Sequence, residues 1–322
     1  MAAFFIIKIL SLFIASFVTA AIAGPFLIRF LYKKEAWKKQ PRTLTMGGDA
    51  TPIFTQLHGT KEISTPRMGG ILIWGTVFFV TGIMFAIAYF FPDSGLSHFN
   101  FVSRSQTWLP LFTLLAASLL GLADDISVIK NTGTYVGGGI RFTVRLGLVL
   151  LIAVLGAWWF YAKLDWSSIY IPFYGDLHIG AGYLILFIMV VIGTFSSSVV
   201  DGLDGLSAGV LLPIFSAFGV ISYFEGLYDL AAFIAVVIGA LTTYLWFNVH
   251  PARFYMGETG IMGLTVTLAV IAFLTNAVIF LPIIGLVLGI ESGSVIIQLL
   301  SKRLLHCSFQ KPKIPNLCFP KS

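Results

Sequence analysis

The stretch TWLPLFTLLAASLLGLADD, residues 107–125, joins an almost wholly apolar run to two adjacent carboxylates. A transmembrane helix needs roughly 17–25 predominantly apolar residues, and this run approaches that length. Acidic side chains at or within a membrane are costly to keep there, and by default they indicate a functional site. The stretch therefore predicts a membrane-spanning helix, over residues 108–123, with Asp124 and Asp125 at its end.

Apolar runs of this kind recur along the whole chain. Of its 322 residues, 57% are hydrophobic and 11% are charged, whereas about a quarter of the residues in a soluble domain carry charge. This composition predicts an all-α fold, a polytopic transmembrane helix bundle in which residues 1–322 form a single integral membrane domain. We expect about nine spans, at residues 4–31, 68–91, 108–123, 143–161, 181–199, 206–223, 230–247, 260–279 and 281–299. Because Pro282 separates the last two, they could instead form one broken hairpin or a long bent helix.

Basic residues are concentrated in alternate loops, and this pattern predicts the orientation of the chain. They include Lys61 and Arg67 in the first loop and Lys130, Arg141 and Arg145 in the third. Short loops rich in lysine and arginine stay in the cytoplasm. We therefore expect the N-terminus outside and the loop 32–67 in the cytoplasm. Three acidic groups, at residues 124–125, 201–204 and 258, would then share the cytoplasmic side of the membrane.

The first acidic motif is the pair Asp124-Asp125. Adjacent carboxylates at a helix end repel one another unless a cation compensates them. Mg²⁺ typically binds one or two carboxylates together with the phosphate oxygens of a substrate. Lys130, a few residues on, could contact a phosphate as a point charge. The alternative is a solvated acidic pair that simply ends a transmembrane helix.

The second motif, DGLDGLSAG at residues 201–209, is more specific. Asp201 and Asp204 are three residues apart, so a helical turn would place both carboxylates on one face. The glycines allow a close backbone approach or an unwound turn, and Ser198 belongs to a serine run before the motif whose hydroxyls can ligate or orient a substrate. Alternatively, the motif is a turn whose aspartates cap the next helix, but capping explains only one of them.

The third motif is FNVHPARFYMGETG, residues 247–260. Arg253 offers a planar donor fork for a phosphate, and Glu258 offers a further carboxylate beside glycines that permit a tight turn. His250, taken alone, is more often structural than catalytic. A weaker motif, TPRMGG at residues 65–70, ends the first basic loop and on its own indicates topology more than substrate binding.

Together, these four motifs resemble those of the polyprenyl-phosphate N-acetylhexosamine-1-phosphate transferase family, from about Lys61 to Arg303. The form of the TPRMGG motif and the run SGSVIIQLLSKR, residues 292–303, are more similar to the muramoyl-pentapeptide branch than to the N-acetylglucosamine branch. The resemblance implies an Mg²⁺-dependent enzyme in which undecaprenyl phosphate attacks the β-phosphate of a UDP-sugar. The products would be UMP and a lipid-linked pyrophosphoryl sugar, here lipid I of peptidoglycan synthesis.

The resemblance also implies a role for each site residue. It assigns catalysis to Asp124, Asp125 and Asp201, and metal binding to Glu258 with Asp124 and Asp125. Substrate binding is assigned to Lys61, Thr65, Lys130, Ser198, Asp204, Asn248, His250 and Arg253. The expected partners are a UDP-sugar nucleotide, undecaprenyl phosphate and membrane lipid, with a homodimer left open and no nucleic acid. The expected location is the bacterial plasma membrane, with the active site on the cytoplasmic face.

Three features depart from the family pattern. Glu258 stands where the family usually has Asp, and Ser198 where it usually has Asn. Residues 301–322 contain one histidine, whereas the family has a His-rich loop followed by a tenth span. A truncated or frameshifted gene would produce such a tail.

Three alternatives stay open from the sequence. The sugar nucleotide could be UDP-N-acetylglucosamine, or the chain could be an inactive paralogue that lacks the His-rich loop. A cation-coupled transporter is the third. Transporter sites lie near the bilayer midplane, often between internal repeats, whereas the acids here map to helix ends and no repeat is evident.

Overall fold

The computed structural model describes residues 2–37, 65–103, 105–130, 139–196, 204–290, 293–294 and 297. Its helices are α1 (Ala2–Lys33), α3 (Gly70–Phe90), α4 (Trp108–Lys130), α5 (Phe142–Lys163), α6 (Gly182–Ser196), α7 (Leu206–Phe224), α8 (Tyr228–Asn248), α9 (Glu258–Leu274) and α10 (Leu281–Ile284). Two short 3-10 helices, η1 (Gly95–Phe99) and η3 (Val278–Phe280), and two strands, β1 (Ser168–Ile171) and β2 (Gly175–His178), complete the described elements.

Six of these helices, α1, α3, α4, α5, α7 and α8, are long and apolar enough to cross a membrane. The shorter apolar helices α6 and α9 run beside them. The prediction of an all-α, polytopic membrane bundle is therefore confirmed, and the first eight expected spans each correspond to one helix. The second half of the expected ninth span, residues 291–299, lies outside the continuously described chain, which ends at residue 290.

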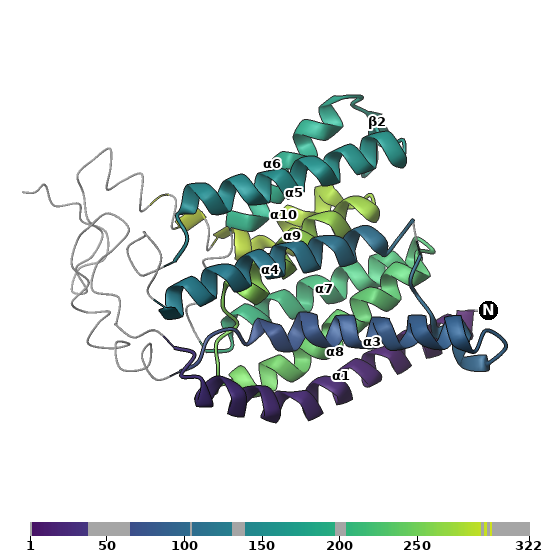
Figure 1. The fold of residues 1–322 in the computed structure, drawn as a ribbon. Coiled ribbons are helices and arrows are strands. Elements are labelled where there is room, and N and C mark those ends of the chain that lie inside the picture. Colours follow the sequence, from purple (N-terminus) through teal and green to yellow (C-terminus); the bar gives the residue numbers. More distant parts are fainter. Residues whose placement is uncertain are drawn as a thin grey trace, which may run out of the picture.

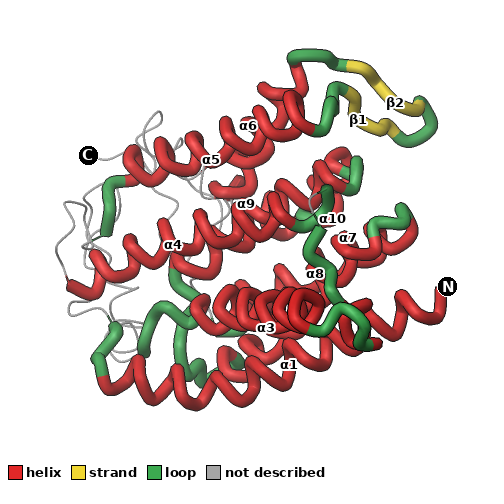
Figure 2. Tube along the Cα trace, turned by 45° about the vertical axis from the view of Figure 1, so that its right-hand side comes forward, coloured by secondary structure: helices red, strands yellow, loops and turns green. Residues whose placement is uncertain are grey.

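The helices pack in layers around two buried members (Figures 1 and 2). Helix α8 packs against α1, α3 and α7, while α9 packs most extensively against α4 and also against α6 and α3. Every residue of α9 from Thr259 to Leu274 is buried, as are most residues of α8. An apolar helix can be covered by lipid or by other helices, and here the neighbouring helices enclose these two.

The two ends of the bundle differ in character (Figure 1). The N-terminus, η1 and the β1–β2 hairpin lie at one end. The hairpin, which the sequence did not predict, is an antiparallel pair with Ser168 opposite His178 and Ile171 opposite Gly175. At the other end α4 and α8 finish and α3, α5 and α9 begin. That end holds the acidic and glycine-rich motifs that the structure describes.

Two expected helix boundaries are wrong. Helix α4 continues to Lys130, so Asp124 and Asp125 lie inside the helix instead of at its end. Their charges are tolerated there because arginines outside α4 pair with them. Helix α9 ends at Leu274, well before Pro282, which lies at the start of α10. Proline is well tolerated there because the first amides of a helix have no intrahelical acceptor.

The packing of α4 on α9 gives a testable expectation. A Cβ added at Gly121 would collide with the backbone carbonyl of Glu258, which cannot rotate away. Overpacking of this kind typically costs about 1–3 kcal/mol, so Gly121→Ala should lower the melting temperature of the protein in detergent. The control is Gly75→Ala in α3, where an added Cβ meets nothing within 4 Å. It should be neutral or stabilising by up to about 1 kcal/mol, and equal losses for both variants would contradict the packing argument.

Candidate active site

The TPRMGG motif and the third motif lie side by side through backbone hydrogen bonds. Tyr255 N donates to Pro66 O, Gly69 N donates to Tyr255 O, and Gly70 N donates to Met256 O, each at 2.8 Å. A Cβ at Gly70 would collide with the backbone of Gly260. The glycines at 69 and 70 therefore allow two chain segments, far apart in sequence, to come within backbone hydrogen-bonding distance beside the start of α9.

The acidic pair on α4 is buried against the start of α9. Asp125 is fully buried and Asp124 almost so. Asp125 Oδ2 accepts a hydrogen bond from Thr259 N at 3.0 Å, and Asp124 Oδ1 accepts one from Ile140 N at 2.7 Å. Because the first amides of a helix lack intrahelical partners and carry partial positive charge, the Asp125 carboxylate stabilises the beginning of α9.

Two arginines compensate these acids. The sequence analysis uses both as indicators of topology and includes Arg67 in the TPRMGG motif, but it assigns neither to the site. Arg67 Nε lies 3.3 Å from Asp125 Oδ1. A guanidinium nitrogen of Arg145, on the first turn of α5, lies 3.3 Å from Asp124 Oδ2 and 3.0 Å from Glu258 Oε1. Three carboxylates from α4 and α9 therefore face two guanidinium groups. One signal for Arg145 was available, since it is a charged residue inside the expected span 143–161.

A second polar group links the start of α7 to the end of α8. Asn248 Oδ1 accepts from Gly205 N at 2.9 Å, and Asn248 Nδ2 donates to Phe254 O at 2.9 Å. Asp204 Oδ2 lies 2.7 Å from His250 Nδ1. The carboxylate of Asp204 thus orients the exposed imidazole, and the amide of Asn248 fixes the loop that leads to Glu258.

The remaining expected site residues are distributed as follows. Arg253 is exposed, with its guanidinium carbon 5.8 Å from the centre of the Phe247 ring. Thr65 is buried, and Lys130 is the exposed last residue of α4. Within the described chain, neither Arg253 nor Lys130 forms an ion pair with the acids. The expected residues Lys61, Ser198 and Asp201 lie outside the described residues.

The acidic group fits a hard divalent cation in donor chemistry. Carboxylate oxygens are the ligands that Mg²⁺ prefers, and Glu258 Oε2 is buried without a hydrogen-bond partner among the described residues. The described residues contain no preformed group of three His, Cys, Asp or Glu side chains with metal-binding geometry. In this structure the Arg145 guanidinium provides the positive charge between Asp124 and Glu258.

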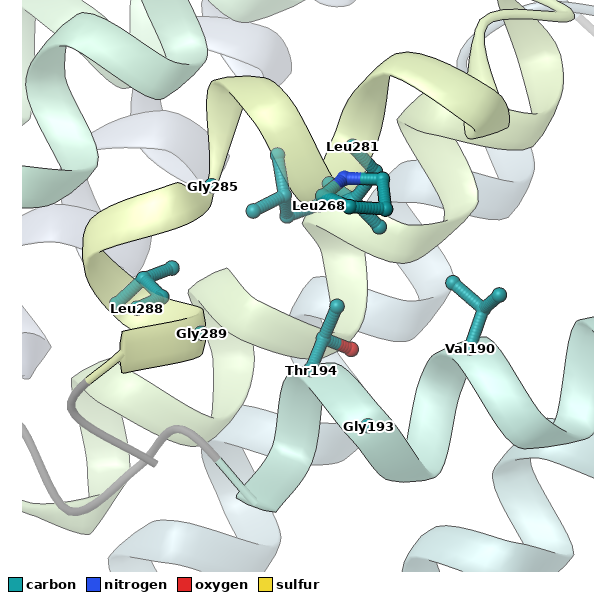
Figure 3. A pocket seen from close by; sticks show the side chains of 9 residues that line it. Val190, Gly193, Thr194, Leu268, Leu281, Gly285, Leu288 and Gly289 are labelled. Carbon is teal, nitrogen blue, oxygen red and sulfur yellow. The ribbon is translucent and has the colours of Figure 1, made fainter. Parts of the chain in front are cut away.

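A separate cavity of about 220 Å³ lies between α6, α9 and α10 (Figure 3). Its lining is mostly apolar and includes Val190 on α6, Leu268 on α9 and Leu288 beyond α10. None of the expected site residues that the structure describes lines it. Its described lining carries no charged side chain that would bind phosphate, so we assign the polar chemistry to the end of the bundle where α4, α5 and α9 meet.

Fold and site together define a polytopic membrane protein with an acidic and arginine-rich site at one end of its helix bundle. The model of the family described as "Glycosyl transferase family 4" matches residues 107–276. This range contains both acidic residues of α4, Arg145 and Glu258. The chain belongs to this family.

Curated relatives extend the match over most of the chain. A phospho-N-acetylmuramoyl-pentapeptide-transferase from Geobacillus sp. (strain WCH70) is 33% identical over 293 residues, which cover 89% of this chain and 82% of the relative. Proteins of the same name are 30% identical in Chloroflexus aggregans, covering 88% of this chain and 72% of the relative, and 30% identical in Pelagibacter ubique, covering 92% and 80%. These relatives are bacterial, which identifies the chain as a multi-pass bacterial membrane protein.

The amide of Asn248 gives a prediction about the site's framework. Asn248→Ala removes both of its hydrogen bonds and leaves Gly205 N and Phe254 O without this partner, at a cost of about 1–3 kcal/mol for each buried group. We expect a clear fall in melting temperature. Thr242→Ala on the same helix removes only a local bond to Ile238 O and should change stability far less. The role of Asn248 as a link between loops would be refuted by equal melting temperatures for the two variants.

Proposed function

We propose that this chain transfers phospho-N-acetylmuramoyl-pentapeptide from its UDP-linked form to undecaprenyl phosphate, giving lipid I and UMP. Relatives that carry this activity in their names align with about nine-tenths of the chain. The observation that carries the proposal is the convergence of Asp124, Asp125 and Glu258 with Arg67 and Arg145 at one end of the bundle. Such a site can hold phosphate groups and a cation together.

Phosphoryl transfer depends mainly on positioning and on neutralising charge. In the proposed reaction a phosphate oxygen of the lipid forms a bond to the β-phosphorus of the UDP-sugar. The bond between that phosphorus and the bridging oxygen breaks, and UMP leaves with the oxygen. Arg67 and Arg145 carry planar donor forks that match phosphate oxygens. They are the described groups best placed to hold the pyrophosphate in line.

The carboxylates supply the complementary part of the site. Asp124 and Glu258 are the residues that would hold Mg²⁺, with Asp125 beside them fixing the start of α9. A bound Mg²⁺ would neutralise charge on the pyrophosphate and on the departing UMP. Glu258 is one methylene longer than the Asp usual in this family, and its buried Oε2 remains available for a further ligand.

Asp204 and His250 form the second part of the proposed site. The hydrogen bond that His250 Nδ1 donates to the Asp204 carboxylate fixes the direction of the imidazole. It leaves the other ring nitrogen toward solvent, since the His250 side chain is 67% exposed. With Nδ1 as the donor to Asp204, the other nitrogen accepts from a hydroxyl of the sugar when the ring is neutral and donates to a nucleotide phosphate when the ring is protonated. Arg253, stacked on Phe247 two residues after the cis His250–Pro251 bond, adds an exposed cation nearby in the sequence.

The location of the site suits two substrates of opposite solubility. A UDP-sugar arrives from water and a polyprenyl phosphate from the membrane, so the reacting phosphates must meet at the membrane boundary. The acids lie at the end of the bundle where the basic loops attach, and loops rich in lysine and arginine stay in the cytoplasm. We therefore place the active site on the cytoplasmic face.

The direct test is release of UMP by the purified protein given undecaprenyl phosphate, with and without Mg²⁺. UDP-MurNAc-pentapeptide and UDP-N-acetylglucosamine are supplied in separate reactions. We expect UMP and lipid I with the first nucleotide, only in the presence of the cation. If UMP is released only in the reaction with UDP-N-acetylglucosamine, that nucleotide is the substrate. If UMP is released with neither nucleotide, the transferase reaction is rejected for this chain.

The acidic group should be indispensable in the same assay. Asp124→Asn, Asp125→Asn and Glu258→Gln should each lower the rate of UMP release by roughly 10²-fold or more, since each removes a charge from the centre that stabilises the transition state. The sequence predicts the same for Asp201→Asn. Asp93→Asn, an exposed acid in the connection between α3 and α4, is the matched control and should retain the wild-type rate. Near-normal rates for the three central variants would show that the chemistry lies elsewhere.

The cytoplasmic assignment can be tested by labelling single cysteines. Asp93→Cys and Arg141→Cys are introduced separately after both native cysteines, Cys307 and Cys318, are changed to serine. A membrane-impermeant maleimide should label position 93 in intact cells and label position 141 only after permeabilisation. Labelling of position 141 from outside would place the acidic site on the wrong side for a cytoplasmic nucleotide.

A further inference from the structure

Arg145 occupies an unusual position at the junction of three helices. It projects from the first turn of α5 and joins Asp124 on α4 to Glu258 at the start of α9, at 3.3 Å and 3.0 Å. Its side chain is only 11% exposed. A single guanidinium therefore lies between two carboxylates that belong to different helices.

The charge balance explains why a cation is needed there. Asp125 has Arg67 and the Thr259 amide as partners. Asp124 also accepts a hydrogen bond from a backbone amide, that of Ile140, but it shares its only cation in the described chain, Arg145, with Glu258. Leaving a buried carboxylate without its partner is strongly destabilising. Arg145 is the described cation that offsets the charge of both carboxylates.

The arrangement is nevertheless incomplete. Among the described residues, Glu258 Oε2 and Arg145 Nε are both buried without a hydrogen-bond partner. A fully satisfied structural ion pair would leave neither atom in this state, because buried polar atoms are almost always paired. An unpaired carboxylate oxygen is suited to a cation, and an unpaired guanidinium N–H is suited to an anion such as a phosphate.

We propose that Arg145 is an internal counter-ion that competes with a divalent cation for Asp124 and Glu258 and moves to the substrate's pyrophosphate when the cation binds. The inference rests on the proposed function for the identity of that anion. The cation must displace a charge-assisted contact, so it binds weakly to the substrate-free protein. A nucleotide pyrophosphate accepts the released guanidinium, so each of the two ligands strengthens binding of the other.

Manganese binding to the purified, substrate-free protein tests the competition without any need for turnover. Mn²⁺ serves as the probe because its paramagnetic resonance signal reports bound and free ion. Arg145→Gln should bind Mn²⁺ roughly tenfold to a hundredfold more tightly than wild type, since charge-assisted contacts no longer oppose the ion. A merely structural arginine predicts the reverse, because its loss would damage the site and lower the affinity.

Two further variants sharpen the result. Arg141→Gln removes the same charge from an exposed position four residues earlier and should leave the Mn²⁺ affinity within about twofold of wild type, as expected for an exposed charge screened by solvent and salt. Arg145→Lys keeps a charge but has no planar fork to bridge both carboxylates, so its affinity should fall between those of wild type and Arg145→Gln. If Arg145→Gln does not fold, the Lys variant carries the test: an affinity no higher than that of wild type overturns the proposal.

The nucleotide arm separates this inference from the proposed reaction. Adding UDP-MurNAc-pentapeptide should tighten Mn²⁺ binding to wild type and have a much smaller effect on Arg145→Gln. Equal tightening in both proteins overturns the proposed movement of Arg145. If the wild-type protein never releases UMP but Arg145→Gln still binds Mn²⁺ more tightly than wild type, the counter-ion role is supported and the transferase reaction is rejected. No gain in affinity for either Arg145 variant rejects the counter-ion role, whatever the enzymatic activity.

Discussion

The compensation of buried carboxylates at the junction of α4 and α9 is the interaction on which the rest of the structure depends. Asp125 is fully buried, and its two oxygens are held by Arg67 and by the Thr259 amide. Removing any of these partners would leave charge inside the bundle, which costs several kcal/mol. The carboxylate of Asp125 on α4 therefore fixes both the start of α9 and the segment that precedes α3.

Close backbone packing brings these charges together. Gly121 on α4 lies against the backbone of Glu258, and Gly257 lies against the Asp125 carboxylate. Side chains at either position would push α9 away from α4 and separate the acids from each other. Gly257 also has a φ of 71°, a conformation that glycine adopts without strain. The glycines of the motifs thus permit the close approach of α4 to α9 and the backbone turn before Glu258, and the carboxylates and arginines supply the charge.

The sequence predicted the bundle well because each span is a long apolar run, and that signal is local. It also predicted that the acids of α4 and α9 would share one end, because loop charge fixes the direction of each helix. It did not predict that α4 continues past Asp125 or that Arg145 joins Asp124 to Glu258. Both depend on contacts between residues far apart in the chain, and no local pattern encodes them. The position of Arg145 inside the expected span 143–161 indicates that it needs a partner, but which acids it joins depends on how α4, α5 and α9 pack.

The two arginines lead to different interpretations of the three acids. Arg67 shares Asp125 with a backbone amide, so that carboxylate is committed to holding α9 in place even when other charges change. Asp124 also accepts a hydrogen bond from a backbone amide, but that amide belongs to Ile140, just before α5, and not to α9. Asp124 and Glu258 share the single guanidinium of Arg145, and Glu258 retains an unpaired oxygen. A cation that replaced Arg145 would find both carboxylates already oriented and would not disturb the start of α9. The division of labour therefore follows from the ion pairs: Asp125 maintains the framework, and Asp124 with Glu258 forms the exchangeable part of the site.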